Sequence, residues 1–398
     1  MPRDSHSVLR AGVVPTGADT QLAQAGYDAL GPEGFINPPI HRASTVLFDS
    51  PRDYTERESR LHDGYFYGPF GTPVSRSLER AIARLEGGAN AIAIPSATAG
   101  VIVLATTVLR AGGHVLLPAS TYFATTQAFL AFEKFGVVVE QYPPDAGRDI
   151  EALLRPDTQL IWLESPGSVL FQVQDLPAIA AVARARKILT ACDATWATPL
   201  GLHPLKLGID LSLHSATKYI GGNSEVSLGL LTSSNEGLHR QLRASALVLG
   251  QGVSADDCFA VLRGMKSLAI RVRHQSTVAL ELASWLENQP LVARVFHPAL
   301  PSHPDHLLWQ RDFVLSSGLF SFSLSAIGRA DIDAFADALQ TFRIGAGWGG
   351  PTSLLALYGL GHWPSTPTES WLIRVQVGFE DPNDLRADLT RALDAFQG

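Results

Sequence analysis

The residue with the clearest chemical potential is Lys218, one of only five lysines in the chain. Ser215 and Thr217 precede it and two glycines follow it in a segment of little charge, so we expect its amine to lie out of water. A desolvated lysine has a lowered pKa and can form a Schiff base with a carbonyl compound. The remaining lysines are interpreted as solvated: Lys134, Lys187, Lys206 and Lys266. Because a single buried lysine is more often ion-paired than reactive, other residues must support the assignment.

Several other features match the needs of pyridoxal phosphate, which requires a lysine, a carboxylate for its ring nitrogen, an aromatic face and phosphate donors. Asp193 follows an apolar run and supplies a carboxylate, although such aspartates also cap helices. Tyr122 supplies an aromatic face, although it also suits a protein interior. The segment 96–100 opens a helix whose N–H groups bind phosphate, helped by the hydroxyls of Ser215 and Thr217. The order of these features along the chain is stronger evidence than any one of them.

An α/β sheet must position these residues, because short apolar runs alternate with helical periodicity between Leu61 and Leu231. Strands are predicted at 91–94, 114–117, 137–142, 159–163, 188–191, 211–213 and 226–231, and helices at 75–86, 101–109, 125–135 and 177–186. Ser75 is the predicted cap of the first helix. Ligands of such sheets bind outside the carboxyl ends of the strands, where the candidate residues lie.

The chain is expected to have three parts. In residues 1–62, prolines and glycines interrupt every period, which predicts an arm that wraps over another surface. Residues 63–255 are predicted to form the α/β domain, and residues 256–398 a smaller α+β domain. In the smaller domain a long helical stretch ends near Trp285, with strands predicted at 319–324 and 372–377 and helices at 331–339 and 382–396.

Composition narrows the classes of function. A chain of 398 residues, 46% hydrophobic and 17% charged, has enough apolar material to fold. The net charge of −7, without a basic run, disfavours nucleic acid as a partner. Cys192 and Cys258 provide neither a disulfide framework nor metal-ligand spacing, which favours a reducing cytoplasm. Residues 1–14 contain no signal-peptide core, and Pro95 interrupts the uncharged stretch 91–109, which predicts a buried strand and helix rather than a membrane span.

A set of motifs extends from about Gly64 to near the end of the chain. They are Tyr67-Gly-Pro-Phe-Gly-Thr72, Leu85-Glu-Gly-Gly88, Leu163-Glu-Ser-Pro-Gly-Ser168, Asp193-Ala-Thr-Trp196, Ala216-Thr-Lys-Tyr219, Arg294-Val-Phe-His-Pro-Ala-Leu-Pro301, Ser317-Gly-Leu-Phe-Ser-Phe322, Gly347-Trp-Gly-Gly350 and Leu372-Ile-Arg374. Together they resemble the fold-type I pyridoxal-phosphate enzymes of cysteine and methionine metabolism. Within that family the Glu-Ser-Pro-Gly-Ser segment, the tryptophan before two glycines and the Ser-Gly-Leu-Phe-Ser run look like the cystathionine β-lyases.

The resemblance implies an aminotransferase-like fold with a large, mostly parallel seven-stranded sheet domain and a smaller C-terminal α+β domain. It implies that Lys218 carries the cofactor and removes the substrate proton, that Asp193 pairs with the ring nitrogen, and that Arg374 binds the substrate carboxylate. An alternative for Arg374 is an arginine that reaches water from a sheet edge. The resemblance further implies that Ala97, Thr98, Ser215 and Thr217 contact the cofactor phosphate. Tyr122 is expected to stack on the cofactor ring and is also a catalytic candidate. Trp348 and Gly347 are expected to contact the substrate.

The resemblance also implies contacts between subunits. Tyr67 is expected to reach the cofactor and substrate of a neighbouring subunit and to assist catalysis there, in a homotetramer built from dimers that share active sites. Many relatives have an arginine two residues after this tyrosine, whereas this chain has Pro69. Further departures are Ala97, Ala194, Gly347 and Pro351. They leave the phosphate contacts and the substrate range open.

The expected activity is therefore carbon–sulfur β-elimination, with L-cystathionine giving L-homocysteine, pyruvate and ammonia in methionine biosynthesis. Alternatives within the family are a broad cysteine-S-conjugate β-lyase or cysteine desulfhydrase, and a γ-lyase or γ-synthase. Outside it, a dinucleotide-dependent oxidoreductase lacks a GxGxxG turn, and a relative that has lost its cofactor is motivated by Pro69.

Overall fold

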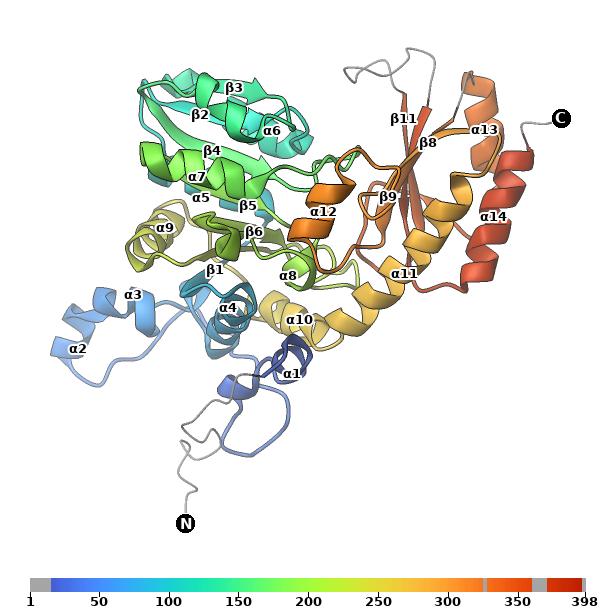
Figure 1. Cartoon of the computed structure of the whole chain (residues 1–398). Coiled ribbons are helices and arrows are strands. Elements are labelled where there is room, and N and C mark those ends of the chain that lie inside the picture. The colour runs from blue at the N-terminus through green and yellow to red at the C-terminus, as the bar shows by residue number, and fades with distance from the viewer. Residues whose placement is uncertain (1–15, 325–327, 360–370, 396–398) are drawn as a thin grey trace.

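The computed structural model describes residues 16–324, 328–359 and 371–395, and its central feature is a seven-stranded sheet (Figure 1). Its strands are β1 (Asn90–Ile94), β2 (His114–Pro118), β3 (Val138–Tyr142), β4 (Thr158–Glu164), β5 (Leu189–Asp193), β6 (Leu211–Ser215) and β7 (Gly229–Ser233). They lie in the order β1-β7-β6-β5-β4-β2-β3, and β7 runs in the direction opposite to the other six. The mostly parallel sheet expected from the sequence is confirmed, and the parallel strands β2, β4, β5 and β6 end at one common edge.

Helices cover both faces of this sheet, because strands of a parallel sheet are apolar on both sides. One apolar cluster joins the strands to α5 (Ala97–Val108), α6 (Phe123–Leu130) and α9 (Glu236–Val248), and another joins them to α7 (Leu176–Arg186). The uncharged stretch 91–109 forms β1 and α5, as expected. Across the described residues, no helix combines the length and apolar character that a membrane span requires.

The helix α4 (Pro73–Glu86) begins earlier than predicted. Thr72, not Ser75, is its N-cap, and Ser75 instead returns a side-chain hydrogen bond to the Thr72 backbone. Proline is favoured in the first turn of a helix, because the N–H that it lacks would have no partner there. With α10 (Ala255–Met265), this helix packs an apolar face against the β1 and β7 end of the sheet.

A second sheet of five strands forms the smaller part of the molecule. Its order is β10 (Arg343–Ile344), β11 (Leu354–Gly359), β12 (Trp371–Gln376), β9 (Leu319–Leu324) and β8 (Val292–Phe296). Its apolar residues pack with α11 (Leu268–Leu286), α13 (Arg329–Asp337) and α14 (Pro382–Asp394). The sequence did not predict β8, β10, β11 or α12 (His306–Asp312), and the end of the predicted helix 382–396 extends beyond the described residues.

The described part of the N-terminal segment, from residue 16 onward, contains short helices: α1 (Ala18–Ala23), α2 (Pro51–Thr55) and α3 (Arg60–Asp63). Leu22 and Ala25 are buried, whereas Phe35, Ile36 and Leu47 are exposed. Figure 1 shows α2 and α3 projecting from the body of the molecule. Residues 1–15, on which the expected absence of a signal peptide rests, lie outside the described residues.

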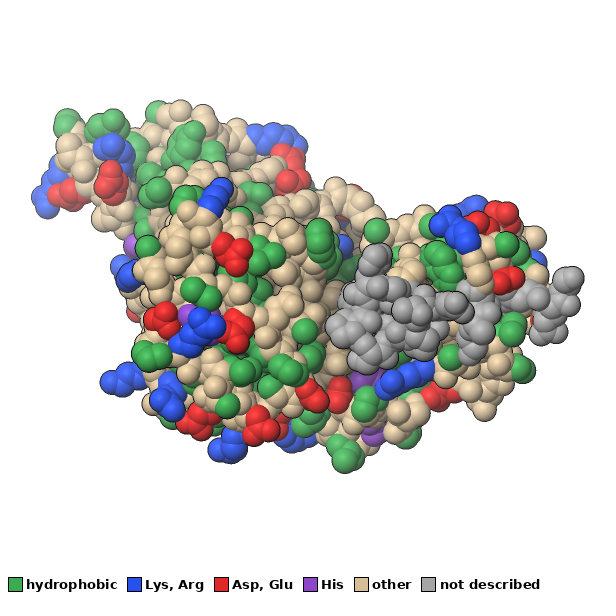
Figure 2. Space-filling model, turned by 90° about the horizontal axis from the view of Figure 1, so that it is seen from above, with side chains coloured by type: hydrophobic (Ala, Val, Ile, Leu, Met, Phe, Trp, Pro, Cys, Tyr) green, Lys and Arg blue, Asp and Glu red, His purple; other side chains and the backbone are tan. Residues whose placement is uncertain are grey.

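Short connecting helices complete the description. They are α8 (Thr198–Gly201) and the 3-10 helices Tyr27–Ala29, Arg57–Ser59, Gly68–Phe70, Glu133–Phe135, Gly147–Leu153 and Pro204–Leu207. On the face shown in Figure 2, basic and acidic side chains are intermixed rather than gathered into a band of one sign. Both cysteines are buried and free.

Candidate active site

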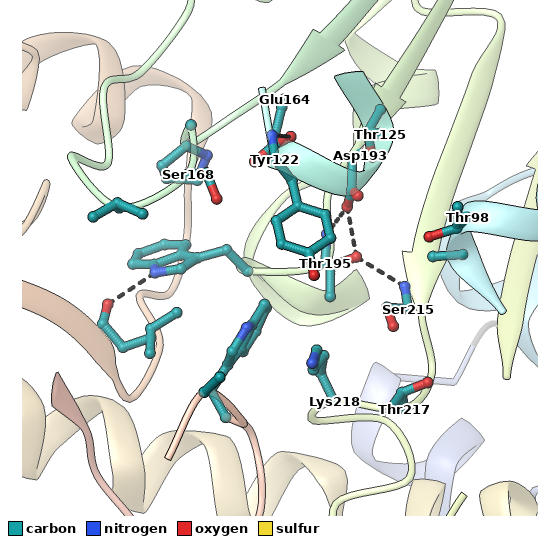
Figure 3. A pocket seen from close by; sticks show the side chains of 18 of the residues that line it. Thr98, Tyr122, Thr125, Glu164, Ser168, Asp193, Thr195, Ser215, Thr217 and Lys218 are labelled. Carbon is teal, nitrogen blue, oxygen red and sulfur yellow. Dashed lines mark hydrogen bonds between the residues drawn. The ribbon is translucent and has the colours of Figure 1, made fainter. Parts of the chain in front are cut away.

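A cavity of about 230 Å³ lies at the carboxyl edge of the large sheet, where that sheet meets the second one (Figure 3). The large sheet and its loops contribute Tyr122, Asp193 and Lys218, and the smaller part contributes Trp348 and Arg374. The indole N–H of Trp196, also in the wall, donates to the backbone oxygen of Leu319 at 2.9 Å and so ties the two parts together. The structure thus brings together residues that lie far apart in the chain.

Lys218 lies in the turn that follows β6. Its backbone is held by hydrogen bonds from Lys218 N to Ser215 O at 3.0 Å and from Gly222 N to Lys218 O at 2.8 Å. Gly349, at φ +82°, passes so close that a β-carbon there would lie 2.8 Å from the Lys218 carbonyl carbon, which requires glycine at this position. Burial and the nearby Arg374 guanidinium lower the pKa of Lys218, and Asp193 opposes the shift. A neutral amine is therefore accessible at less alkaline pH than in a solvated lysine.

One of the four lysines predicted to be solvated is not fully exposed in the structure. Lys134, Lys187 and Lys206 are exposed, as expected. Lys266 is half-buried, with its Nζ 3.2 Å from Asn37 Oδ1 and 5.7 Å from the centre of the Tyr27 ring. The N-terminal segment covers this lysine, and a contact of that kind has no local signal in the sequence. Lys266 does not line the cavity.

Asp193 is the last residue of β5 and is held in one orientation. Its Oδ1 accepts hydrogen bonds from Thr195 N at 2.9 Å and from the Thr195 hydroxyl at 2.5 Å. The same hydroxyl oxygen accepts the Ser215 N–H at 2.8 Å, which joins the ends of β5 and β6. Loss of water raises the pKa of Asp193, while the Thr195 bonds and the Lys218 charge oppose the rise. Its Oδ2 can accept a protonated ring nitrogen.

Arg374 lies in β12, the middle strand of the second sheet, and only 8% of it is exposed. Its Nη2 donates to the backbone oxygen of Ala346 at 2.6 Å. Burial lowers its pKa, although an arginine remains protonated in proteins. The alternative of an edge arginine that reaches water is wrong, because this side chain is buried in the cavity wall. A buried guanidinium in the wall of a cavity is suited to a ligand carboxylate.

The opposite end of the cavity is suited to a phosphate. Ala97 and Thr98 form the first turn of α5, where N–H groups have no partner within the helix, and Ser96 caps it by accepting the Ala99 N–H at 3.0 Å. Strand β7 passes so close that a β-carbon on Gly229 would lie 2.6 Å from the Ser96 carbonyl carbon. This close approach keeps the helix start at the cavity wall.

Hydroxyl groups surround the same end. The cavity is lined there by Thr98, Ser215, Thr217 and Ser227. The Thr217 Oγ1 accepts the Leu228 N–H at 3.0 Å and lies 3.3 Å from the Leu228 oxygen, so this hydroxyl also fastens its own turn. The lysine, carboxylate, arginine and helix-start donors fit pyridoxal phosphate and an amino acid, the ligands expected from the sequence.

Tyr122 and Glu164 form the side of the cavity between these two ends. Tyr122 is the N-cap of α6 and is 51% exposed. Its backbone N–H donates to Glu164 Oε2 at 2.7 Å. Trp348 faces the lysine from the other part of the molecule, with its ring centre 5.2 Å from Lys218 Nζ and 5.6 Å from that of Tyr219. Trp348 thus lines the cavity and also packs on Tyr219.

Two candidate residues lie outside the wall of this cavity. Gly347 lies between Ala346 and Trp348, which both line it, but is not itself a lining residue. Tyr67 is 43% exposed, pairs with Thr45 in an isolated β-bridge and does not line the cavity of its own chain. Nearby, Pro69 accepts the Val253 N–H through its backbone oxygen at 3.0 Å. Within one chain, neither Tyr67 nor Gly347 contributes to the wall of the candidate site.

Several residues of the wall were not predicted from the sequence. Glu164 is the last residue of β4, and the rule that selected Asp193 at the end of β5 applies to it equally. Thr195, which orients Asp193, lies two residues beyond its strand and lacks such a signal. Val169 and Phe171 adopt positive φ angles of 68° and 53°, which their residue types do not indicate.

Comparisons with known proteins agree on one family. A family model described as Cys/Met metabolism PLP-dependent enzyme matches residues 19–394. A putative cystathionine beta-lyase of Rhizobium johnstonii is 42% identical over 99% of both chains. The cystathionine beta-lyase of Escherichia coli is 36% identical over 93% of this chain and 96% of its own. An L-alanine/L-glutamate racemase of Wolbachia pipientis is 34% identical over 94% and 96% of the two chains.

Solved structures show the same fold. A cystathionine gamma synthase from Xanthomonas oryzae pv. oryzae, solved in complex with cystathionine, has a TM-score of 0.88 and 29% identity. The alignment covers 96% of this chain and 99% of that one. The sheet expected from the sequence and the fold-type I architecture are thereby confirmed together.

Proposed function

Because the chain belongs to the Cys/Met metabolism family of PLP-dependent enzymes, we propose that it is a carbon–sulfur β-lyase acting on L-cystathionine. The reaction consumes one water and yields L-homocysteine, pyruvate and ammonia. The observation that carries the proposal is a single cavity lined by Asp193, Lys218 and Arg374 together. The β-lyase names of the Rhizobium and Escherichia coli relatives support β- over γ-elimination.

Each group of residues in the cavity has a separate proposed role in binding the cofactor or the substrate. When bound to the substrate amine, pyridoxal phosphate withdraws electrons from Cα and so acidifies the Cα–H bond. Asp193 holds the proton on the ring nitrogen, and Ala97, Thr98, Ser215 and Thr217 bind the phosphate. Arg374 binds the α-carboxylate through two parallel hydrogen bonds and so fixes the direction of the Cα–H bond.

Lys218 is the proposed base. The lowered pKa of its amine allows Nζ to take the Cα proton, and the Trp348 ring lies beside Nζ. The electron pair of the Cβ–S bond leaves with sulfur, which receives the proton from Nζ and departs as a thiol. Water then converts the remaining three-carbon fragment to pyruvate and ammonia.

Related activities share the first step. A broad cysteine-S-conjugate β-lyase or cysteine desulfhydrase would release pyruvate with another thiol or with hydrogen sulfide. A γ-lyase would release 2-oxobutyrate, and a γ-synthase would form a new carbon–sulfur bond. The racemase of Wolbachia pipientis suggests a further outcome, in which the proton returns to the other face of Cα. Product analysis separates all of these.

The substitution Lys218→Ala tests the proposal. We expect it to abolish the visible absorbance of the lysine-bound cofactor and to lower pyruvate release from L-cystathionine by about 10³-fold. Absorbance spectra and coupled pyruvate and homocysteine assays provide the measurement. Lys206→Ala, at an exposed lysine, is the matched control and should change neither. Full turnover by Lys218→Ala would refute the assignment, and 2-oxobutyrate from the wild type would replace β- with γ-elimination.

The proposal includes the setting in which the enzyme works. We propose a homotetramer of dimers in which Tyr67 enters the neighbouring subunit's cavity, and a cytoplasmic location. We also propose that residues 1–62 form an arm, residues 63–255 the cofactor-binding domain and residues 256–398 the smaller domain. Tyr67 is 43% exposed and does not line the cavity of its own chain, which supports the first of these points.

A further inference from the structure

Glu164 provides a second carboxyl group in the cavity wall, beside that of Asp193. It has no role in the reaction proposed above. It ends β4, and its Cα is paired in register with that of Asp193 at the end of β5. Neighbouring residues paired across parallel strands point to the same side of the sheet, about 5 Å apart. Both side chains line the cavity, and Glu164 is only 7% exposed.

The contacts of Glu164 lead to Tyr122. Its Oε2 accepts the Tyr122 backbone N–H at 2.7 Å, at the point where α6 begins. In Figure 3 Glu164 lies at the backbone end of Tyr122, and the ring extends from there toward the middle of the cavity. This hydrogen bond therefore holds the backbone from which the Tyr122 ring extends.

The backbone of Glu164 is itself well fixed. Its N–H donates to Gln174 Oε1 at 3.0 Å. The Gln174 side-chain amide donates to the Tyr142 hydroxyl at 2.9 Å, and that hydroxyl donates to the Trp162 oxygen at 3.0 Å. All three of these side chains are fully buried. The end of β4 from which the Glu164 side chain extends is thus held by a buried hydrogen-bond network.

The chemistry of the site favours a proton on this carboxyl. Two ionised carboxylates at neighbouring strand ends repel one another, so one of such a pair holds a proton near neutral pH. Burial, followed by the charge of Asp193, raises the pKa of Glu164 well above its ordinary range, and the hydrogen bonds from Tyr122 and Ser168 only partly offset this. A neutral Glu164 leaves Asp193 as the single negative charge available to the ring nitrogen.

We propose that Glu164 is a positioning residue, whose protonated carboxyl holds the backbone of Tyr122 and thereby places the Tyr122 ring against the cofactor that Asp193 orients. The inference rests on the proposed roles of Tyr122 and Asp193. Glu164 touches neither substrate nor reacting atoms in this scheme. Its role is to position Tyr122, the residue proposed to contact the cofactor.

Three substitutions test the role of Glu164. Glu164→Gln keeps the accepting oxygen and is neutral, Glu164→Ala is also neutral but removes the oxygen, and Glu164→Asp keeps a carboxyl that is too short to reach Tyr122. The readouts are the circular dichroism of the bound cofactor in its visible band and the affinity of the apoprotein for pyridoxal phosphate. A buried glutamate outside the cavity provides the control, Glu79→Gln, which should lower stability without changing the dichroism.

We expect Glu164→Gln to match the wild type in dichroism and cofactor affinity. Glu164→Ala and Glu164→Asp should lose much of the dichroism and bind the cofactor about tenfold more weakly, the scale of one hydrogen bond. The apoprotein of each variant should still unfold cooperatively. If Glu164→Ala does not fold, Glu164→Asp supplies the same comparison.

Two results would overturn the inference. Wild-type dichroism in Glu164→Ala or Glu164→Asp would show that Tyr122 does not depend on this carboxyl. Equal losses in Glu164→Gln and Glu164→Ala would show that the ionised form is required. Tyr122→Ala separates these failures from that of the proposed function, because unchanged dichroism in that variant would remove Tyr122, rather than Glu164, from the cofactor site.

Discussion

At the scale of residues, Lys218 and Arg374 are two cations that line one cavity. Burial is the larger cause of the lowered pKa of Lys218, and the charge of Arg374 is the second. Removing that charge stabilises the protonated amine and therefore raises the pKa of Lys218. We predict that Arg374→Gln shifts the pH profile of cofactor capture toward higher pH and leaves its alkaline plateau unchanged.

The measurement is the rate at which apoprotein captures pyridoxal phosphate, followed by absorbance across a pH series without substrate. This readout separates the electrostatic effect from the proposed carboxylate binding by Arg374. Arg343→Gln serves as the control, because Arg343 is an exposed arginine of the same sheet. A profile for Arg374→Gln that overlaps the wild type would show that the two charges do not interact.

The residues of the site divide into those with a local sequence signal and those without one. Asp193 and Lys218 follow apolar runs, so the sequence predicts them at the functional edge of the sheet. Thr195 lies in the turn after β5, where its hydroxyl bonds Asp193. Val169 has a left-handed backbone conformation, which β-branched residues avoid. The Thr195 hydroxyl also accepts the Ser215 N–H, a contact between separate segments that no local sequence pattern marks.

At the scale of elements, α4 and α9 are joined by a buried ion cluster. Glu79 accepts from Arg76 Nη1 at 3.0 Å, from Arg243 Nη2 at 2.8 Å and from the Ala93 N–H of β1 at 3.1 Å. Burial raises the pKa of Glu79, but the charges of Arg243 and Arg76 exceed that effect and lower it to about 2. The carboxylate therefore stabilises the fold above its ordinary pKa of 4.5, and this stability is lost as pH falls toward 2.

We predict that Glu79→Gln lowers the free energy of unfolding by about 3 kcal/mol near neutral pH, because it leaves two buried guanidinium groups without their carboxylate. The difference from the wild type should shrink as pH falls from 4.5 toward 2. Urea unfolding at several pH values measures this. Glu236→Gln, in an exposed pair with Arg240, should have little effect. A pH-independent difference would mean that Glu79 acts by packing rather than by charge.

The elements themselves were predictable where their apolar residues have a regular period. Strand β9 agrees with the predicted range, and α7 begins one residue earlier. The start of α4 was misplaced because Pro73 was not taken as a first-turn residue. Strand β8 was missed because its middle residues, Ala293 and Arg294, are exposed and break the apolar run that marks a buried strand.

At the scale of the whole molecule, the candidate site is open on one side in a single chain. Tyr122 is 51% and Phe123 72% exposed, although both follow the strand end that borders the cavity. The N-terminal segment likewise exposes Leu47 at 90% and Phe35 at 73%. Large apolar side chains exposed in this way favour a covering surface. A second copy of the chain, as proposed above, would cover them.

A shared site makes a prediction that activity assays can test. If Tyr67 serves the neighbouring cavity, a mixed dimer of one Tyr67→Ala chain and one Lys218→Ala chain has one site with both residues intact. We predict that each variant alone is strongly impaired and that coexpression restores about a quarter of wild-type turnover, since half of randomly formed dimers are mixed and each has one intact site.

The restored activity depends on which chain supplies Tyr67. If this tyrosine served the cavity of its own chain, every site in the mixed dimer would carry one substitution and coexpression would restore nothing. Two tags of different affinity allow the mixed species to be purified and its turnover measured directly. A double variant, with Tyr67→Ala and Lys218→Ala in one chain, paired with the wild type provides the control: both of its sites then lose one residue, and the mixed dimer should be as impaired as the single variants.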